Sequence, residues 1–288
     1  MSRKHCLSIL IQDTFDKALL SKILHSYDIS FYAEIEEARV NINEQLPNLI
    51  IIDSHFSNSG FALCKNLLHN QKTQGIPILF IFDTIDRDGI TTMFHSGAAD
   101  YILKPFNQFE VVSRIDIHIK YAKQKQKLEF LANYDPMTQT YNRRTFFKQA
   151  EQAIIYSRKK KITLHLILFH FDTLFAINEE YGHFTGDKIL QEFSHILTDS
   201  LNAEGIIGRL DGNNFAVVLT GNPEETTTSL TSSIIDKSNE ITVDGAKPVK
   251  IVSATTYLYN PDESIDDLLL EASMQIEACQ IARKTRNY

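Results

Sequence analysis

The stretch ITLHLILFHFDTLFAINEEYGHFTGDKIL, Ile162 to Leu190, changes its periodicity halfway along. Its first part is a nearly unbroken apolar run, which is typical of a strand in the centre of a sheet. Its second part has two amphipathic helical patterns, interrupted at Tyr181-Gly182-His183 and again at Thr185-Gly186-Asp187. Glycine weakens a helix, so we place a break at both positions. The stretch therefore predicts a buried strand followed by short helical segments.

Further strands follow in GIIGRLDGNNFAVVLTG, Gly205 to Gly221, where two apolar runs flank the turn residues DGNN. This arrangement predicts a β-hairpin. Upstream, NYDPMTQTYNRRTFF (133–147) contains the turn dipeptide Asp135-Pro136 and then leads into an amphipathic helix that ends at RKKK (158–161). The mixture predicts an α/β domain with a mainly antiparallel sheet that helices cover on one face.

The first 120 residues follow another pattern, in which short apolar runs alternate with amphipathic segments. The runs LSILI, NLIIID, IPILFIF and YILKP lie between helical patterns, as expected for buried parallel strands in a doubly wound sheet. Ligands of such sheets bind beyond the carboxyl ends of the strands. Carboxylates there, facing a lysine, can hold a divalent cation and a phosphoryl group. The strand-end residues are Gln12, Asp13, Asp53, Phe82, Asp83, Thr84 and Lys104.

A long helix is predicted between the two patterns, over residues 107–132, because this segment has neither Gly nor Pro. Val111, Ile115, Ile119 and Ala122 form one apolar stripe, which Leu128 and Leu131 resume. Such a helix is suited to act as a lever or to pair with a second copy. The alternative is a plain solvated linker.

Composition restricts the class of protein. The 288 residues are 43% hydrophobic and 23% charged, which indicates a soluble protein of two domains. We find neither a membrane-spanning run nor a signal peptide, so we expect a cytoplasmic location. The net charge of −7 argues against nucleic-acid binding. The basic runs KYAKQKQK (120–127) and RKKK are interpreted as solvated helix faces.

The N-terminal region resembles the receiver domain of two-component response regulators. GAADYILKPF, Gly97 to Phe106, matches that family's motif almost residue for residue. The resemblance implies a flavodoxin-like fold over residues 1–122, with Asp53 as the phosphoacceptor and with Lys104 and Tyr101 as the phosphate contact and switch residues. It also implies Mg2+, held by Asp13 and Asp53, and a sensor histidine kinase as the partner.

The match to receivers is uneven around this pocket. The family's acidic pair is reduced to Gln12-Asp13 or Asp13-Thr14, and the hydroxyl expected after the fourth strand is replaced by Phe82-Asp83, with Thr84 two places late. A site with fewer carboxylates binds Mg2+ more weakly. Asp53 as an unmodified polar residue at a strand end therefore stays an alternative, as does Tyr101 as a core residue.

After a helical linker at 123–132, residues 133–288 resemble a GGDEF domain, the fold of the diguanylate cyclases that condense two GTP into cyclic di-GMP. YDPMTQTYNRR, FHFDTLFAINEEYGHFTGDKIL and RLDGNNF correspond to three motifs of that family, in its order and spacing. The family binds its catalytic metals through an acid on the first strand and an acid after two glycines. Here these positions are His170 and Asn213, and the next acid is Asn214.

Further departures in this domain point to lost turnover. Asp211 replaces the first glycine of the motif, and Phe175 replaces a phosphate-binding lysine. Asn178 and Asp187 match the family's guanine-binding side chains, although helix capping would also suit them.

We therefore expect a homodimeric response regulator with a catalytically inactive GGDEF output that acts on a downstream protein. One alternative is an active diguanylate cyclase whose atypical metal site uses Asp172 or Asp211. Another is a sensor that binds GTP without turnover. A DNA-binding output is the most distant alternative, because we find no helix-turn-helix pattern.

Overall fold

The structure is a computed structural model that describes residues 4–84, 87–202, 204–242, 249–258, 260 and 262–286. The chain divides into two compact units, Met1–Leu128 and Glu129–Tyr288. None of the described helices is both long and apolar enough to span a bilayer.

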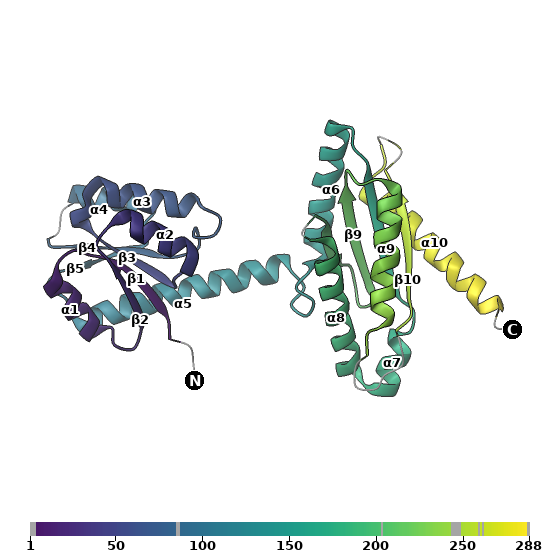
Figure 1. Cartoon of the computed structure of the whole chain (residues 1–288), viewed down its shortest axis with the longest axis horizontal. Helices are drawn as coiled ribbons and strands as arrows, with labels where there is room; N and C mark the ends of the chain where they lie inside the picture. Colours follow the sequence, from purple (N-terminus) through teal and green to yellow (C-terminus); the bar gives the residue numbers. More distant parts are fainter. Residues whose placement is uncertain are drawn as a thin grey trace. The chain divides into compact units, whose positions relative to one another are not determined.

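The first unit alternates strands and helices along the chain (Figure 1). Its elements are β1 (Cys6–Leu10), α1 (Thr14–Ile23), β2 (Asp28–Tyr32), α2 (Ile35–Gln45), β3 (Leu49–Asp53), the 3-10 turn η1 (Ser54–Phe56), α3 (Ser57–His69), β4 (Ile78–Phe82), α4 (Arg87–His95), β5 (Asp100–Leu103) and α5 (Gln108–Asn133).

The strands of this unit form one parallel sheet in the order β2-β1-β3-β4-β5. All five residues of β3 and of β4 are buried, because α1 and α5 cover one face of the sheet and α2, α3 and α4 cover the other. The predicted flavodoxin-like doubly wound fold is thus confirmed. The carboxyl ends of β1, β3, β4 and β5 meet at one edge.

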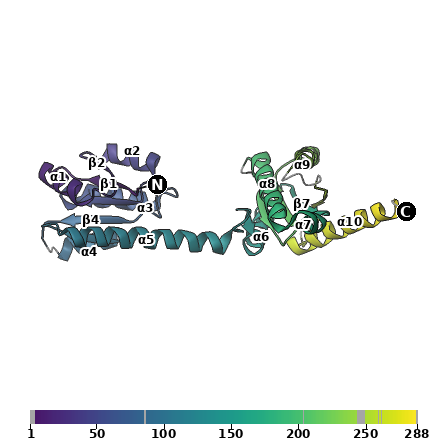
Figure 2. The same cartoon turned by 90° about the horizontal axis from the view of Figure 1, so that it is seen from below.

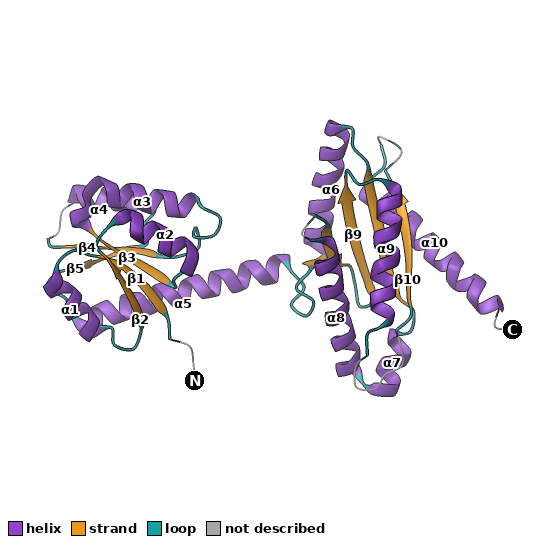
Figure 3. Cartoon of the chain, in the orientation of Figure 1, coloured by secondary structure: helices purple, strands orange, loops and turns teal. Residues whose placement is uncertain are grey.

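Helix α5 runs without interruption from the first sheet to Asn133 (Figure 3). Val111, Ile115 and Ile119 of the predicted stripe are buried against the sheet. The two compact units divide within this helix, between Leu128 and Glu129.

The second unit is built around a second five-stranded sheet. Its elements are β6 (Tyr141–Asn142), α6 (Arg143–Lys160), β7 (Leu164–Phe171), α7 (Leu174–Tyr181), α8 (His183–Leu201), β8 (Ile206–Arg209), β9 (Asn214–Thr220), α9 (Glu224–Asn239), β10 (Ile251–Tyr257) and α10 (Ile265–Arg286).

The second sheet has the order β10-β7-β9-β8-β6, and among these pairs only β6 and β8 run parallel. The predicted mainly antiparallel sheet and the β8–β9 hairpin are confirmed. The expectation that helices cover one face was wrong: α7, α8 and α9 pack on one face, and α6 and α10 on the other (Figure 2). Seven of the eight residues of β7 are buried for this reason.

The predicted break at Thr185-Gly186-Asp187 was also wrong, because α8 continues through these residues. The chain breaks only at Gly182, whose φ of 85° is left-handed. Gly186 instead allows α7 to approach closely, since a Cβ there would lie 2.0 Å from Asn178 Oδ1.

Candidate functional site

A cluster of charged side chains lies where the parallel strands of the first unit end. Lys104 follows β5, and its Nζ atom lies 2.8 Å from Asp16 Oδ2, 3.2 Å from Asp53 Oδ2 and 2.9 Å from Asp83 Oδ1. Three carboxylates from different elements therefore share one ammonium group. They belong to a cavity of about 610 Å³, which Gln12, Asp13, Thr14, His55 and Phe56 complete.

His55 closes this carboxylate pocket from the other side. Its backbone N donates to Asp53 Oδ1 at 2.9 Å, and its Nδ1 lies 2.6 Å from the same oxygen. Its Nε2 lies 3.1 Å from Asp83 Oδ2. Because Lys104 contacts the second oxygen, both carboxylate oxygens of Asp53 have partners, and the side chain is only 2% exposed.

The charges in this pocket shift the pKa values of Lys104 and Asp83. Burial lowers the pKa of Lys104, but hydrogen bonds to Asp16 and Asp83 and the charge of Asp53 outweigh burial and hold the pKa above its ordinary value. The hydrogen bond from Lys104 lowers the pKa of Asp83. Lys104 and Asp83 therefore stabilise each other in their charged forms.

The predicted metal ligand Asp13 caps a helix. It is the N-cap of α1 and accepts a hydrogen bond from the backbone N of Asp16 at 2.8 Å. Carboxylate oxygens suit Mg2+, so the donors of Asp13 and Asp53 fit the ion chemically. Lys104 nevertheless occupies the point between the carboxylates, and no three His, Cys, Asp or Glu side chains within the described ranges are arranged to hold a metal.

Tyr101 lies on β5 and is half-buried. Its ring meets Phe82 edge-on with centroids 6.3 Å apart, and the Arg114 guanidinium of α5 lies 5.7 Å from the ring centroid. The neighbouring Asp100 accepts from Arg114 at 2.7 Å and contacts His118 at 3.1 Å. The predicted switch residue therefore lies in a cluster that joins β5 to α5.

The hairpin of the second unit carries a different cluster. His170 on β7 lies opposite Asn214 on β9, and its Nδ1 is 2.8 Å from Asn214 Oδ1. Asn214 Nδ2 donates to both carboxylate oxygens of Asp211 at 2.9 Å, and the backbone N of Asn213 donates to the same group at 3.2 Å. The structure thus joins these residues into one hydrogen-bonded chain.

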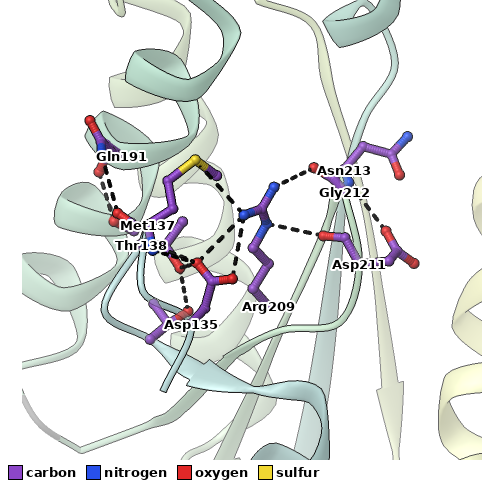
Figure 4. Close-up of polar contacts among 10 residues, drawn as sticks. Asp135, Met137, Thr138, Gln191, Arg209, Asp211, Gly212 and Asn213 are labelled. Atoms are coloured by element: carbon purple, nitrogen blue, oxygen red, sulfur yellow. Dashed lines mark hydrogen bonds and ion pairs between the residues drawn. The ribbon is translucent and has the colours of Figure 1, made fainter. Parts of the chain in front are cut away.

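Arg209 anchors this turn to the loop that follows α5 (Figure 4). It donates to the carbonyl oxygens of Asp211 and Gly212 at 3.1 and 3.0 Å, and it lies 3.5 Å from Asp135. Burial raises the pKa of Asp135, but hydrogen bonds from the backbone and hydroxyl of Thr138 outweigh it and lower the pKa. A charged Asp135 therefore holds Arg209 in place.

The predicted guanine ligands Asn178 and Asp187 lie on α7 and α8, and Asn178 Oδ1 faces Gly186, which precedes Asp187 in the chain. Asn178 Oδ1 is buried and has no hydrogen-bond partner among the described residues, whereas Asp187 is exposed. Neither is an N-cap, because Thr173 and Gly182 occupy those positions.

Phe175 and Asp172 are the two remaining positions named from the sequence in this unit. The side chain of Phe175 is 77% exposed. Asp172, named above as an alternative metal ligand, accepts a hydrogen bond from Gln280 at 2.9 Å.

Two family models match the chain. The model of the diguanylate cyclase GGDEF domain covers residues 132–286, and the response regulator receiver model covers residues 10–116. The probable diguanylate cyclase DgcC of Escherichia coli K12 is 28% identical over 149 residues, which are 49% of this chain and 40% of DgcC. The response regulator PleD of Caulobacter vibrioides is 23% identical over 195 residues, which are 64% of this chain and 42% of PleD.

The chain thus spans about two fifths of the length of these two curated relatives. Among solved structures, the coiled coil and GGDEF domain of DgcB from Caulobacter crescentus aligns with a TM-score of 0.54 and 15% identity. The alignment covers 61% of this chain and 94% of that structure. At this identity the likeness concerns the fold alone.

Proposed function

Because the chain belongs to the family of diguanylate cyclase GGDEF domains, with a receiver domain ahead of it, we propose that it is a response regulator whose GGDEF output does not convert GTP. One observation carries the proposal: the family's two metal-binding positions are His170 and Asn213, and its next acid is Asn214, so none of the three side chains is a carboxylate. His170 instead bonds to the Asn214 amide, which donates to Asp211. These groups do not fit a Mg2+ ion, which needs hard oxygen ligands with negative charge.

The test is incubation of the purified chain with GTP and either Mg2+ or Mn2+, followed by quantification of cyclic di-GMP. We expect no product above the protein-free control. Product from the wild type that disappears in Asp172→Asn or Asp211→Asn would overturn the proposal and favour the atypical cyclase.

A variant with restored acids, His170→Asp/Asn213→Glu, sharpens the test. Two added carboxylates should raise the affinity for Mn2+ about 100-fold, as measured by calorimetry. The matched control, His170→Asn/Asn213→Gln, keeps the side-chain sizes but adds no charge, and it should bind as weakly as the wild type.

The signal that this response regulator receives is proposed to be phosphoryl transfer from a histidine kinase to Asp53. One carboxylate oxygen of Asp53 attacks the phosphorus atom, a P–O bond forms, and the bond to the donor nitrogen breaks. Lys104 is placed to neutralise the added negative charge, whereas His55 must release Oδ1. Mg2+ held by Asp13 and Asp53 would supply further charge neutralisation. A small-molecule phosphodonor should add one phosphoryl group to the intact mass, and Asp53→Asn should abolish it.

The output is proposed to act as a homodimer on a downstream protein. Ile117, Tyr121, Leu128 and Leu131 repeat along α5 with heptad spacing, and their side chains are 63%, 66%, 68% and 46% exposed. Such a seam suits a parallel coiled coil between two copies. Leu128→Glu/Leu131→Glu should shift the sedimentation coefficient to that of a monomer, whereas Lys72→Glu/Lys148→Glu should leave it unchanged.

A second candidate function, a guanine nucleotide sensor, is favoured by the orphaned oxygen of Asn178. A buried acceptor without a partner costs about 1–3 kcal/mol, which a ligand or a bound water would relieve. Calorimetry with GTP should show binding that Asn178→Ala weakens, with Asn202→Ala as the control. Absence of heat with any guanine nucleotide would exclude the sensor.

A further inference from the structure

A basic cavity lies on the first unit, away from the carboxylate pocket. Lys120, Lys123 and Lys127 of α5 line it together with His5, which precedes β1. Steps of three and four residues place the lysines on one helix face, spread over about 10 Å. The cavity volume is about 440 Å³, within the range of small-molecule sites. Asp116, Ile119 and Gln124 complete its lining.

The charges of this basic cavity are poorly balanced. Lys123 Nζ lies 3.3 Å from both ring nitrogens of His5. Lys120 and Lys127 have no ion pair within the described part of the chain. The one carboxylate in the lining, Asp116, already accepts a hydrogen bond from the Tyr27 hydroxyl at 2.5 Å. Three ammonium groups and one carboxylate therefore line the cavity, which leaves an excess of positive charge.

We propose that this cavity binds a small oligophosphate, the chemistry shared by inorganic pyrophosphate and nucleoside polyphosphates. Lysine ammonium groups bind phosphates as flexible point charges, and three of them along one helix can contact successive phosphate groups. Their methylene stems supply apolar contact for the remainder of a ligand.

The size of the ligand follows from the electrostatics of the whole chain. At physiological ionic strength the Debye length is about 8 Å, so a small anion senses mainly the local lysines. An extended polyanion such as nucleic acid also meets the remaining surface of a chain with net charge −7. The geometry therefore favours a compact ligand.

The site joins the N-terminal segment to α5, since His5 and the lysines lie on these two elements. An oligophosphate held between them tightens the packing of α5 against the receiver sheet. Ligand binding should therefore raise the midpoint of thermal unfolding of the full-length chain. Binding at the basic cavity does not depend on whether the GGDEF site turns over GTP.

The test is isothermal titration calorimetry of the full-length chain with pyrophosphate, in a buffer without divalent cations, phosphate or sulfate. The variant Lys120→Gln/Lys123→Gln/Lys127→Gln should lose affinity at least about tenfold. The matched control, Lys148→Gln/Lys159→Gln/Lys160→Gln, removes the same charge from helix α6 and should stay within twofold of the wild type. Circular dichroism establishes that both variants are folded.

Two further arms identify the ligand and the site. GTP, titrated in an Asn178→Ala/Asp187→Ala background that removes the candidate guanine contacts, reports on nucleotide polyphosphates at the basic cavity. The single variant His5→Gln, which alters the fourth basic residue of the lining, should also weaken pyrophosphate binding.

Three outcomes overturn the proposal. The first is no heat with pyrophosphate or GTP at millimolar concentration. The second is an equal loss in the α6 control, which would indicate a response to net charge alone. The third is an oligonucleotide that binds more tightly than pyrophosphate through the same lysines, which would identify a nucleic-acid surface.

Discussion

The carboxylate pocket of the receiver and the hairpin cluster of the GGDEF domain are both polar sites at strand ends, but they achieve balance by opposite means. In the receiver, three carboxylates surround Lys104, and His55 bridges two of them. In the hairpin, His170 and Asn214 carry no carboxylate; they bond to each other, and the Asn214 amide donates to the one acid, Asp211. A pocket balanced by charge responds when charge is added. A cluster balanced by neutral hydrogen bonds needs no ion to be satisfied.

Among the substitutions that test this contrast, Lys104→Met should cause the largest loss of stability. Removal of the ammonium leaves Asp53, which is 2% exposed, facing two further carboxylates. Breaking one partner of a buried pair costs about 3 kcal/mol, and we expect that loss of unfolding free energy at pH 7 from urea denaturation. The control Lys72→Met removes an exposed lysine and should change stability by less than about 0.5 kcal/mol.

The pH dependence of the same variant has a definite sign. Lys104 lowers the pKa of Asp83 in the folded state, so the wild type gains stability above the unfolded pKa and loses it as the pH falls through the folded pKa. Lys104→Met lacks this gain. The difference between the two proteins should therefore be full at pH 7 and shrink below about pH 4. A difference that grows in acid would contradict the charge balance described above.

An intermediate effect is expected for Arg209→Gln in the hairpin. Arg209 holds two turn carbonyls and Asp135, and its side chain is 14% exposed. Loss of hydrogen bonds from a charged donor should cost about 1.5 kcal/mol. Arg144→Gln, at an exposed position on α6, is the control. If both variants unfold at the same urea concentration, Arg209 does not anchor the turn.

The fold can be predicted from the sequence because its strands and helices have strong hydrophobic periodicity. The continuous apolar runs of β3 and β4 and the turn at Asp211–Asn214 predict the parallel sheet and the hairpin directly. Helices cover both faces of the second sheet rather than one, and the almost unbroken apolar run of β7 is consistent with this burial on both faces. Gly186 predicts a helix break from its own sequence context, because its actual role, the close approach of Asn178, depends on a neighbouring helix.

The residues of the carboxylate pocket can be predicted from the sequence only in part. Strand-end positions identified Asp53, Asp83 and Lys104, but not Asp16 or His55. Asp16 lies one helical turn after Asp13, a spacing that could have suggested it. The bridge made by His55 depends on two acids from different strands, and no local pattern encodes it. Partners distant in the chain are fixed by tertiary packing.

The smallest expected stability costs are those of Asp83→Asn and Asp211→Asn. Their dependence on salt compares the two sites directly. Asp83 is 50% exposed and pairs with Lys104 and His55, so its replacement should cost about 0.5 kcal/mol at low salt. The cost should fade at about 1 M NaCl, where the Debye length is about 3 Å. Asp211 accepts from two neutral amides. Its replacement should cost about as much, but equally at both salt concentrations. Urea titrations at low and high salt measure all four values, and a salt-dependent cost at Asp211 would show that the hairpin, too, is balanced by charge.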